Sequence, residues 1–143
     1  MDHVVYVDAK AKELSSLLDG SKTMIIRGAT GRKLPHGRVF AGDVLYFIEN
    51  NADGLVKAKA NVLRAHSTEK LTEVDSVDTI NGFQKKLKLS DAQFVKLAGK
   101  QYLVLIDVAN VEAVEPFAID KSNYGNMDDW LPVEAIETVK IID

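Results

Sequence analysis

The chain has 143 residues, of which 46% are hydrophobic and 27% are charged, as is typical of one globular domain. It contains no cysteine, which excludes disulfides, thiolate metal sites and a thiol nucleophile. No apolar run reaches the length of about 18 residues that a membrane-spanning helix requires, and the N-terminus lacks the pattern of a secretion signal. These features predict one cytoplasmic domain over residues 1–143, with no membrane contact.

The net charge of −3 averages a positive N-terminal half and an acidic C-terminal half. No acidic residue occurs between Asp19 and Asp43, and the cations of that segment are Lys22, Arg27, Arg32, Lys33 and Arg38. A segment of one sign can concentrate positive potential around an anion. It can equally be a solvated loop that the acidic half neutralises, so both interpretations stay open.

The N-terminal third alternates strand and helix patterns. Val4–Val7 has the β-branched composition of a strand, and Asp8 is a suitable N-cap for a helix that ends at Gly20. Thr23–Ile26 predicts the next strand. The connection Gly28–Gly37 is rich in glycine, and loops of this length without structure of their own are often functional.

A hairpin follows this loop. Val44–Ile48 is apolar on both faces, and Asn50–Gly54 has the composition of a turn. The returning strand, Leu55–Ala65, alternates apolar and polar residues, with small alanines on its apolar face. Small side chains there suit the crowded interior of a curved sheet or small barrel.

Residues 67–100 change to a helical period. Ser76 is a possible cap of the first helix, and Ser90 begins a capping box for the second. Strand periodicity returns in Tyr102–Pro116, and Val139–Ile142 is a last strand candidate. The pattern predicts an α+β, mainly β fold: a mixed barrel with an N-terminal helix and a helical insert covering one side.

The sequence offers little support for metal or cofactor chemistry. The three histidines, His3, His36 and His66, lie in no nucleophile or metal-ligand motif. Gly28–Lys33 resembles a phosphate loop superficially, but it lacks the required spacing and no helix pattern follows it. We therefore expect no cofactor and no metal.

Binding chemistry is better represented. Lys22 and Arg27 flank one predicted strand, and Lys57 and Lys59 share one face of another. Lysine and arginine both engage phosphate. Tyr124 and Trp130 lie in the tail and are candidates for stacking on bases. A single tryptophan in a small domain is more often a packing residue, and this alternative is the stronger one for Trp130.

One segment resembles a known family. Gly20–Arg27 is similar to the G-x-K-x-x-E-x-R signature of ASCH domains, which belong to the PUA-like superfamily, and Val39–Phe47 resembles that family's conserved turn and strand. The order of the later elements is also similar, so that the resemblance covers roughly residues 10–140. It implies a PUA-like pseudobarrel of five or six strands, with a cleft beside the signature that binds RNA or a nucleotide.

The resemblance carries the cleft role over to Gly20, Lys22 and Arg27, which match the signature. Ile25 occupies the position of the signature glutamate. Some ASCH proteins hydrolyse acylated cytidines with the signature lysine and a threonine at that position, and isoleucine offers neither a carboxylate nor a hydroxyl. Lys22 is therefore expected to lack its usual partner.

Three functional hypotheses result. The first is a module that binds RNA or a nucleotide through the cationic residues named above. The second is a small nucleoside hydrolase that uses Lys22, with a partner recruited from Thr23, Asp43 or Glu49. The third is a protein-interaction domain that uses the acidic tail and the helical insert. For the anion site, Lys22 is expected to be exposed, since lysine is rarely buried.

Overall fold

A computed structural model describes residues 1–122, 124 and 129–142. The strands are β1 (Asp2–Val7), β2 (Met24–Ala29), β3 (Val44–Glu49), β4 (Leu55–Ser67), β5 (Tyr102–Ala118) and β6 (Trp130–Glu134). The helices are α1 (Glu13–Leu18), α2 (Glu73–Leu87), α3 (Asp91–Leu97) and a short 3₁₀ turn, η1 (Ile136–Thr138). Across these residues, none of the helices combines the length and the apolar character needed to span a membrane.

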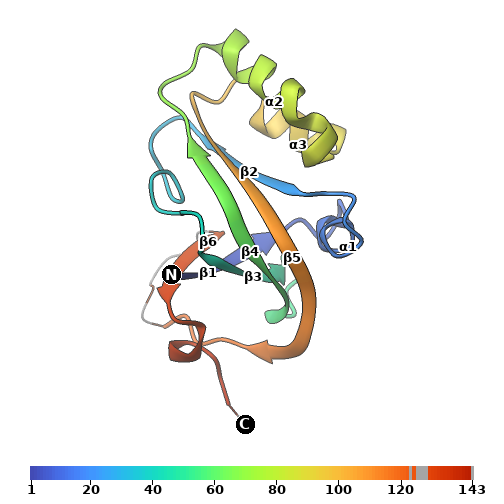
Figure 1. The fold of residues 1–143 in the computed structure, drawn as a ribbon, viewed down its shortest axis with the longest axis vertical. Helices are drawn as coiled ribbons and strands as arrows, with labels where there is room; N and C mark the ends of the chain where they lie inside the picture. Colours follow the sequence, from blue (N-terminus) through green and yellow to red (C-terminus); the bar gives the residue numbers. More distant parts are fainter. Residues whose placement is uncertain (123, 125–128, 143) are drawn as a thin grey trace.

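The six strands form one curled sheet in the order β2-β5-β4-β3-β1-β6. Neighbours pair antiparallel except β1 and β3, which run parallel. Figure 1 shows β4 and β5 as a long twisted pair, with α2 and α3 together near one end of it and the C-terminus near the other. The sheet is a half-barrel with β2 and β6 at its edges. The prediction of a mainly β, α+β fold with a helical insert is confirmed.

The buried side chains follow the two faces of this sheet. Inside the curl, Ile25, Phe47 and Trp130 belong to the largest apolar cluster. On the other face, α2 packs through Ile80 and Leu87, and α3 through Phe94 and Leu97. They cover the strand residues Met24, Ile26, Leu103 and Leu105. Successive residues of β2 thus serve opposite faces, as the period of two requires.

The helix boundaries differ from the predictions where tertiary contacts compete with local signals. The capping box at Ser90 is present, with its hydroxyl accepting from the N–H of Gln93. The cap of α2 is Thr72, not Ser76, which is buried inside the helix. α1 begins only at Glu13, because Asp8 forms a turn in which its carboxylate accepts from the N–H of Ala11.

The predicted strand Val139–Ile142 is wrong. In its place, β6 pairs with β1, and the following segment forms η1 and a single bridge between Ile119 and Lys140. Pro132 and the neighbouring acids of β6 masked the strand signal in the sequence. β6 lies at a sheet edge, which is where a proline is tolerated in a strand.

A β-bulge in β4 changes which side chains face the helices. The pairing of β4 with β5 shifts between Val62 and Arg64, so Leu63 is the extra residue. Before the bulge, Ala58, Ala60 and Val62 are buried inside the curl. After it, Arg64 lies opposite Asp107 and His66 opposite Leu105, so both turn to the face that carries α2.

Candidate functional site

Two adjoining hollows meet at the edge strand β2. The loop hollow, about 260 Å³, is lined by Arg27, Gly28, Ala29, Gly31, Lys33, Leu34, His36, Tyr102, Val104 and Asp129. The helix hollow, about 340 Å³, is lined by Tyr6, Asp8, Glu13, Ile26, Arg27, Gly28, Asn50, Leu89, Gln93, Lys96, Leu97, Lys100 and Asp129. They share Arg27, Gly28 and Asp129. Both volumes are close to or within the range of small-molecule sites, which begins at about 300 Å³.

Arg27 stands where the two hollows meet, and the fold fixes its orientation. Its Nη1 donates to the carbonyl of Ile26 at 2.9 Å, and its Nη2 donates to the carbonyl of Tyr6 at 2.6 Å. Its Nε lies 3.2 Å from a carboxylate oxygen of Asp129. The guanidinium also lies over the ring of Trp130, 5.5 Å from the centroid. With 16% of the side chain exposed, Arg27 presents a fixed positive charge with its remaining N–H groups.

Gly28 allows α3 and β5 to approach β2 closely at this point. A Cβ on Gly28 would lie 3.1 Å from a methyl of Leu103, 3.1 Å from a methyl of Leu97 and 3.3 Å from the Cβ of Lys100. Such contacts are tighter than ordinary packing allows. The absence of a side chain therefore brings Lys100 to the wall of the helix hollow.

The loop hollow combines cations with an aromatic ring. His36 donates from Nε2 to the carbonyl of Thr68 at 2.8 Å, since a carbonyl can only accept. Its ring meets Tyr102 edge-on with centroids 5.6 Å apart. Arg32 lies over Tyr102 at 5.6 Å and near Glu69 at 3.6 Å. Two cations, Arg27 and Lys33, stand against the single acid, Asp129, among the lining residues.

The helix hollow has charges of both signs. Asp8 and Glu13 lie on its β1–α1 side, and Lys96 and Lys100 lie at the end of α3. Neither lysine forms an ion pair with any residue of the described chain. Tyr6 also lines this hollow, and its hydroxyl accepts from Nζ of Lys121 at 2.8 Å.

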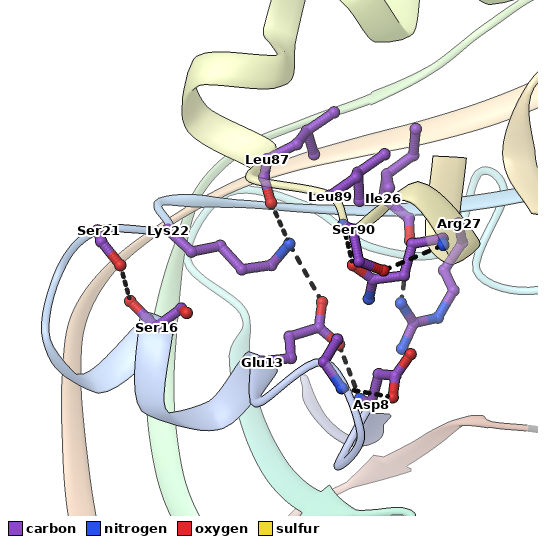
Figure 2. A network of polar contacts seen from close by, with 12 residues as sticks. Asp8, Glu13, Ser16, Ser21, Lys22, Ile26, Arg27, Leu87, Leu89 and Ser90 are labelled. Atoms are coloured by element: carbon purple, nitrogen blue, oxygen red, sulfur yellow. Dashed lines mark hydrogen bonds and ion pairs between the residues drawn. The ribbon is translucent and has the colours of Figure 1, made fainter. Parts of the chain in front are cut away.

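Lys22 is buried, contrary to the sequence-based expectation. Its side chain is 2% exposed, it lines neither hollow, and its Nζ lies 3.2 Å from a carboxylate oxygen of Glu13. The ammonium also donates to the carbonyl of Leu87. Figure 2 shows it between the carboxylate from α1 and the carbonyl at the end of α2. Burial lowers the pKa of Lys22, and the charge of Glu13 partly opposes this shift.

Glu13 supplies the partner that the sequence analysis expected Lys22 to lack. It is 7% exposed, and its second oxygen accepts from the N–H of Asp8 at 2.9 Å. In the described chain, none of the three partners considered from the sequence, Thr23, Asp43 and Glu49, contacts the Lys22 ammonium. Asp43 bonds His3, and Glu49 lies near Lys57. A nucleophile must reach its substrate. Lys22 does not reach either hollow, so the hydrolase hypothesis in its simple form receives no support from this geometry.

The other predicted site residues are dispersed. Arg38 is exposed and Gly20 turns the chain before β2 with a φ of +81°, and neither lines a hollow. Lys57 is paired with Asp53 at 2.6 Å, and Lys59 with Glu112 at 3.3 Å. Tyr124 packs against the apolar cluster at the opposite end of the sheet.

Trp130 is a packing residue in this fold. It is fully buried, and its Nε1 donates to Nδ1 of His3 at 3.0 Å. His3 is equally buried, and its Nε2 contacts Asp43 at 2.8 Å. These partners define a neutral histidine with its proton on Nε2. Burial lowers the pKa of His3, and Asp43 opposes the shift. A base cannot stack on Trp130 without opening this core.

No protein-family model matches the chain, and a search of curated proteins finds no match. Solved structures do match. Two single-residue variants of an ASCH protein from Zymomonas mobilis superpose with a TM-score of 0.68 and 14% identity, over 96% of this chain and 91% and 93% of theirs. The chain has an ASCH-like fold. A further structure of an ASCH protein from Zymomonas mobilis gives a TM-score of 0.64 and 15% identity, over 93% of this chain and 89% of that one.

Several residues of this site could not be predicted from the sequence. Glu13, Tyr6 and Tyr102 belong to strand or helix patterns and look like ordinary surface or core positions. Lys96 and Lys100 follow the capping box of α3, and only the close approach at Gly28 brings them to β2. The one available signal was the glycine itself, which is unusual inside a strand and marks a close approach.

Proposed function

We propose that this ASCH-like chain binds single-stranded RNA or a nucleotide in the two hollows that meet at Arg27. The observation that carries the proposal is the combination of cations and a tyrosine around the edge of β2. The loop hollow contains Tyr102, and each hollow contains at least two cationic side chains. Phosphate-binding cations beside aromatic faces are the usual means of holding unpaired bases.

The charges assign different parts of the ligand to the two hollows. The loop hollow has an excess of positive charge, from Arg27 and Lys33 against Asp129, so it is the better place for a phosphate. Gly28 and Gly31 have no side chains to fill this hollow, so the ligand can approach the backbone there. The helix hollow is larger and balanced in charge, which suits an uncharged base and sugar.

A salt series tests the phosphate part of the proposal. Binding of a fluorescent single-stranded RNA of about ten nucleotides is measured by anisotropy between about 50 and 200 mM salt. For single strands, log K falls with log salt by about 0.7 per phosphate contact. Lys33→Gln is expected to reduce this slope by about one contact. Lys85→Gln is the matched control, because Lys85 is exposed on α2 and lines neither hollow.

A second variant tests the aromatic part. Tyr102→Leu is expected to weaken binding by about 1–3 kcal/mol, the cost of losing one stacked base, without changing the salt slope. Tyr102→Phe retains the ring and is expected to bind like the parent. The proposal is contradicted if RNA does not bind at low salt, or if Lys85→Gln weakens binding as much as Lys33→Gln does.

A further inference from the structure

A third hollow lies on the sheet face that carries α2, away from the loop hollow. It has a volume of about 280 Å³ and is lined by Met24, Arg64, His66, Phe83, Lys86, Leu105 and Asp107. We call it the outer hollow. α2 packs over β2 and β5. The outer hollow lies between this helix and β4.

The base of the outer hollow is apolar. Met24 and Leu105 are 2% and 4% exposed, and both belong to the cluster beneath α2. Phe83 lies on α2 with 36% of its surface exposed, which is high for a phenylalanine on the packed side of a helix. An apolar group of a ligand would remove this surface from water.

Two cations, Arg64 and Lys86, lie at the rim of the outer hollow, and both form ion pairs with Asp107. Nε of Arg64 lies 3.0 Å from one oxygen of Asp107, and Nζ of Lys86 lies 3.4 Å from the other. The side chain of Arg64 is 75% exposed, and its terminal nitrogens donate to no residue of the described chain. The planar fork of its guanidinium is therefore oriented by Asp107 and available to a second anion.

The β-bulge at Leu63 is what creates this arrangement. If β4 paired regularly through Leu63, alternation would place Arg64 and His66 on the same face as Val62, toward the inside of the sheet. The bulge instead places Arg64 opposite Asp107 on the α2 face. Bulges commonly redirect a side chain next to a binding site.

We propose that the outer hollow binds a monocarboxylate with a flat or aliphatic apolar body. The apolar body packs on Met24, Phe83 and Leu105, and the carboxylate accepts from the terminal nitrogens of Arg64 and from Lys86. The charge decides between anions. Arg64 and Lys86 against Asp107 leave one positive charge at the rim, which one carboxylate neutralises, whereas a phosphate dianion would leave an excess of negative charge.

The probe is naphthalene-2-carboxylate, compared with the uncharged 2-naphthalenemethanol of nearly the same shape. Binding to the full chain is followed by amide chemical shifts in NMR titrations. The carboxylate is expected to bind about tenfold more tightly than the alcohol, the usual order for a hydrogen bond to a charged group. The shifts are expected to centre on residues 64–66, 83–86 and 105–107.

Two arms distinguish the source of the carboxylate. A short acetylated peptide that ends in phenylalanine is compared with the same peptide amidated at its C-terminus. Tighter binding of the free peptide than of the naphthalene acid identifies a protein terminus as the ligand, and the reverse order identifies a small molecule. If neither acid binds better than its neutral counterpart, the proposal is wrong.

Variants complete the test. Arg64→Gln is expected to reduce the affinity of the acid about tenfold, to that of the alcohol. Lys86→Gln is expected to weaken it several-fold, whereas Lys85→Gln, its exposed neighbour on α2, leaves it unchanged. Asp107→Asn keeps an amide oxygen that can accept from Nε of Arg64 but removes the negative charge from the rim, and it is expected to tighten binding. Equal losses in Lys85→Gln and Lys86→Gln, or weaker binding by Asp107→Asn in a folded protein, overturn the proposal.

Discussion

The buried pair of Lys22 and Glu13 makes a quantitative prediction about stability. Glu13→Ala leaves the ammonium of Lys22, 2% exposed, with the Leu87 carbonyl as its one remaining partner in the described chain. At the observed separation of 3.2 Å, an effective dielectric constant of about 20 gives an attraction of about 5 kcal/mol. Removing one partner of a buried pair costs about 3–5 kcal/mol in other proteins, which agrees.

The cost also has an upper limit that depends on pH. A lysine with an ordinary pKa near 10.4 can lose its proton at pH 7 for about 5 kcal/mol, and at pH 9 for about 2 kcal/mol. The destabilisation by Glu13→Ala is therefore expected to decrease by up to about 3 kcal/mol between pH 7 and pH 9. Combining Lys22→Met with Glu13→Leu removes both charges and is expected to restore most of the stability.

The assay is urea unfolding at both pH values, followed by far-UV circular dichroism. The matched control is Glu112→Ala, because Glu112 and Lys59 form a pair of almost the same length, 3.3 Å, with side chains 62% and 40% exposed. Exposed pairs contribute at most about 1 kcal/mol. If Glu13→Ala costs no more than Glu112→Ala, or its cost does not depend on pH, the reasoning about the buried pair is refuted.

Three other predictions follow from the described contacts. The folded state lowers the pKa of His3, so as pH falls the unfolded chain binds a proton at this histidine before the folded chain does. The free energy of unfolding is therefore unaffected by His3 above its ordinary pKa of about 6.5 and decreases as pH falls below that value. A His3→Gln variant should lose this part of the acid sensitivity in urea titrations at pH 7.5 and 5. Gly28→Ala is expected to cost about 1–3 kcal/mol through crowding, whereas Gly31→Ala, with no atom within 4 Å of its added Cβ, should be neutral by thermal melting. Ser90→Ala removes the cap of α3 and is expected to cost about 1 kcal/mol in the same melts, and a loss below about 0.3 kcal/mol would mean that the box contributes little.

The sequence determined the local features of this protein, because each depends on residues close together in the chain. Alternation identified the hairpin of β3 and β4, and the helical period with its capping box located the insert. The signature segment at Gly20–Arg27 indicated an ASCH-like fold, which the solved structures support. The expectation for β6 failed because a short edge strand carries a weak period-two signal.

Only the tertiary structure decided which charges meet. Lys22 follows a turn and reads as exposed, yet α1 and the end of α2 close over it, and Glu13 reaches it from another element. Likewise, the bulge at Leu63 in β4 turns Arg64 to the sheet face that carries α2. Gly28 in β2 allows Lys100 to reach the helix hollow. Pairing register and close packing depend on segments far apart in the chain, so periodicity along a single strand or helix does not contain them.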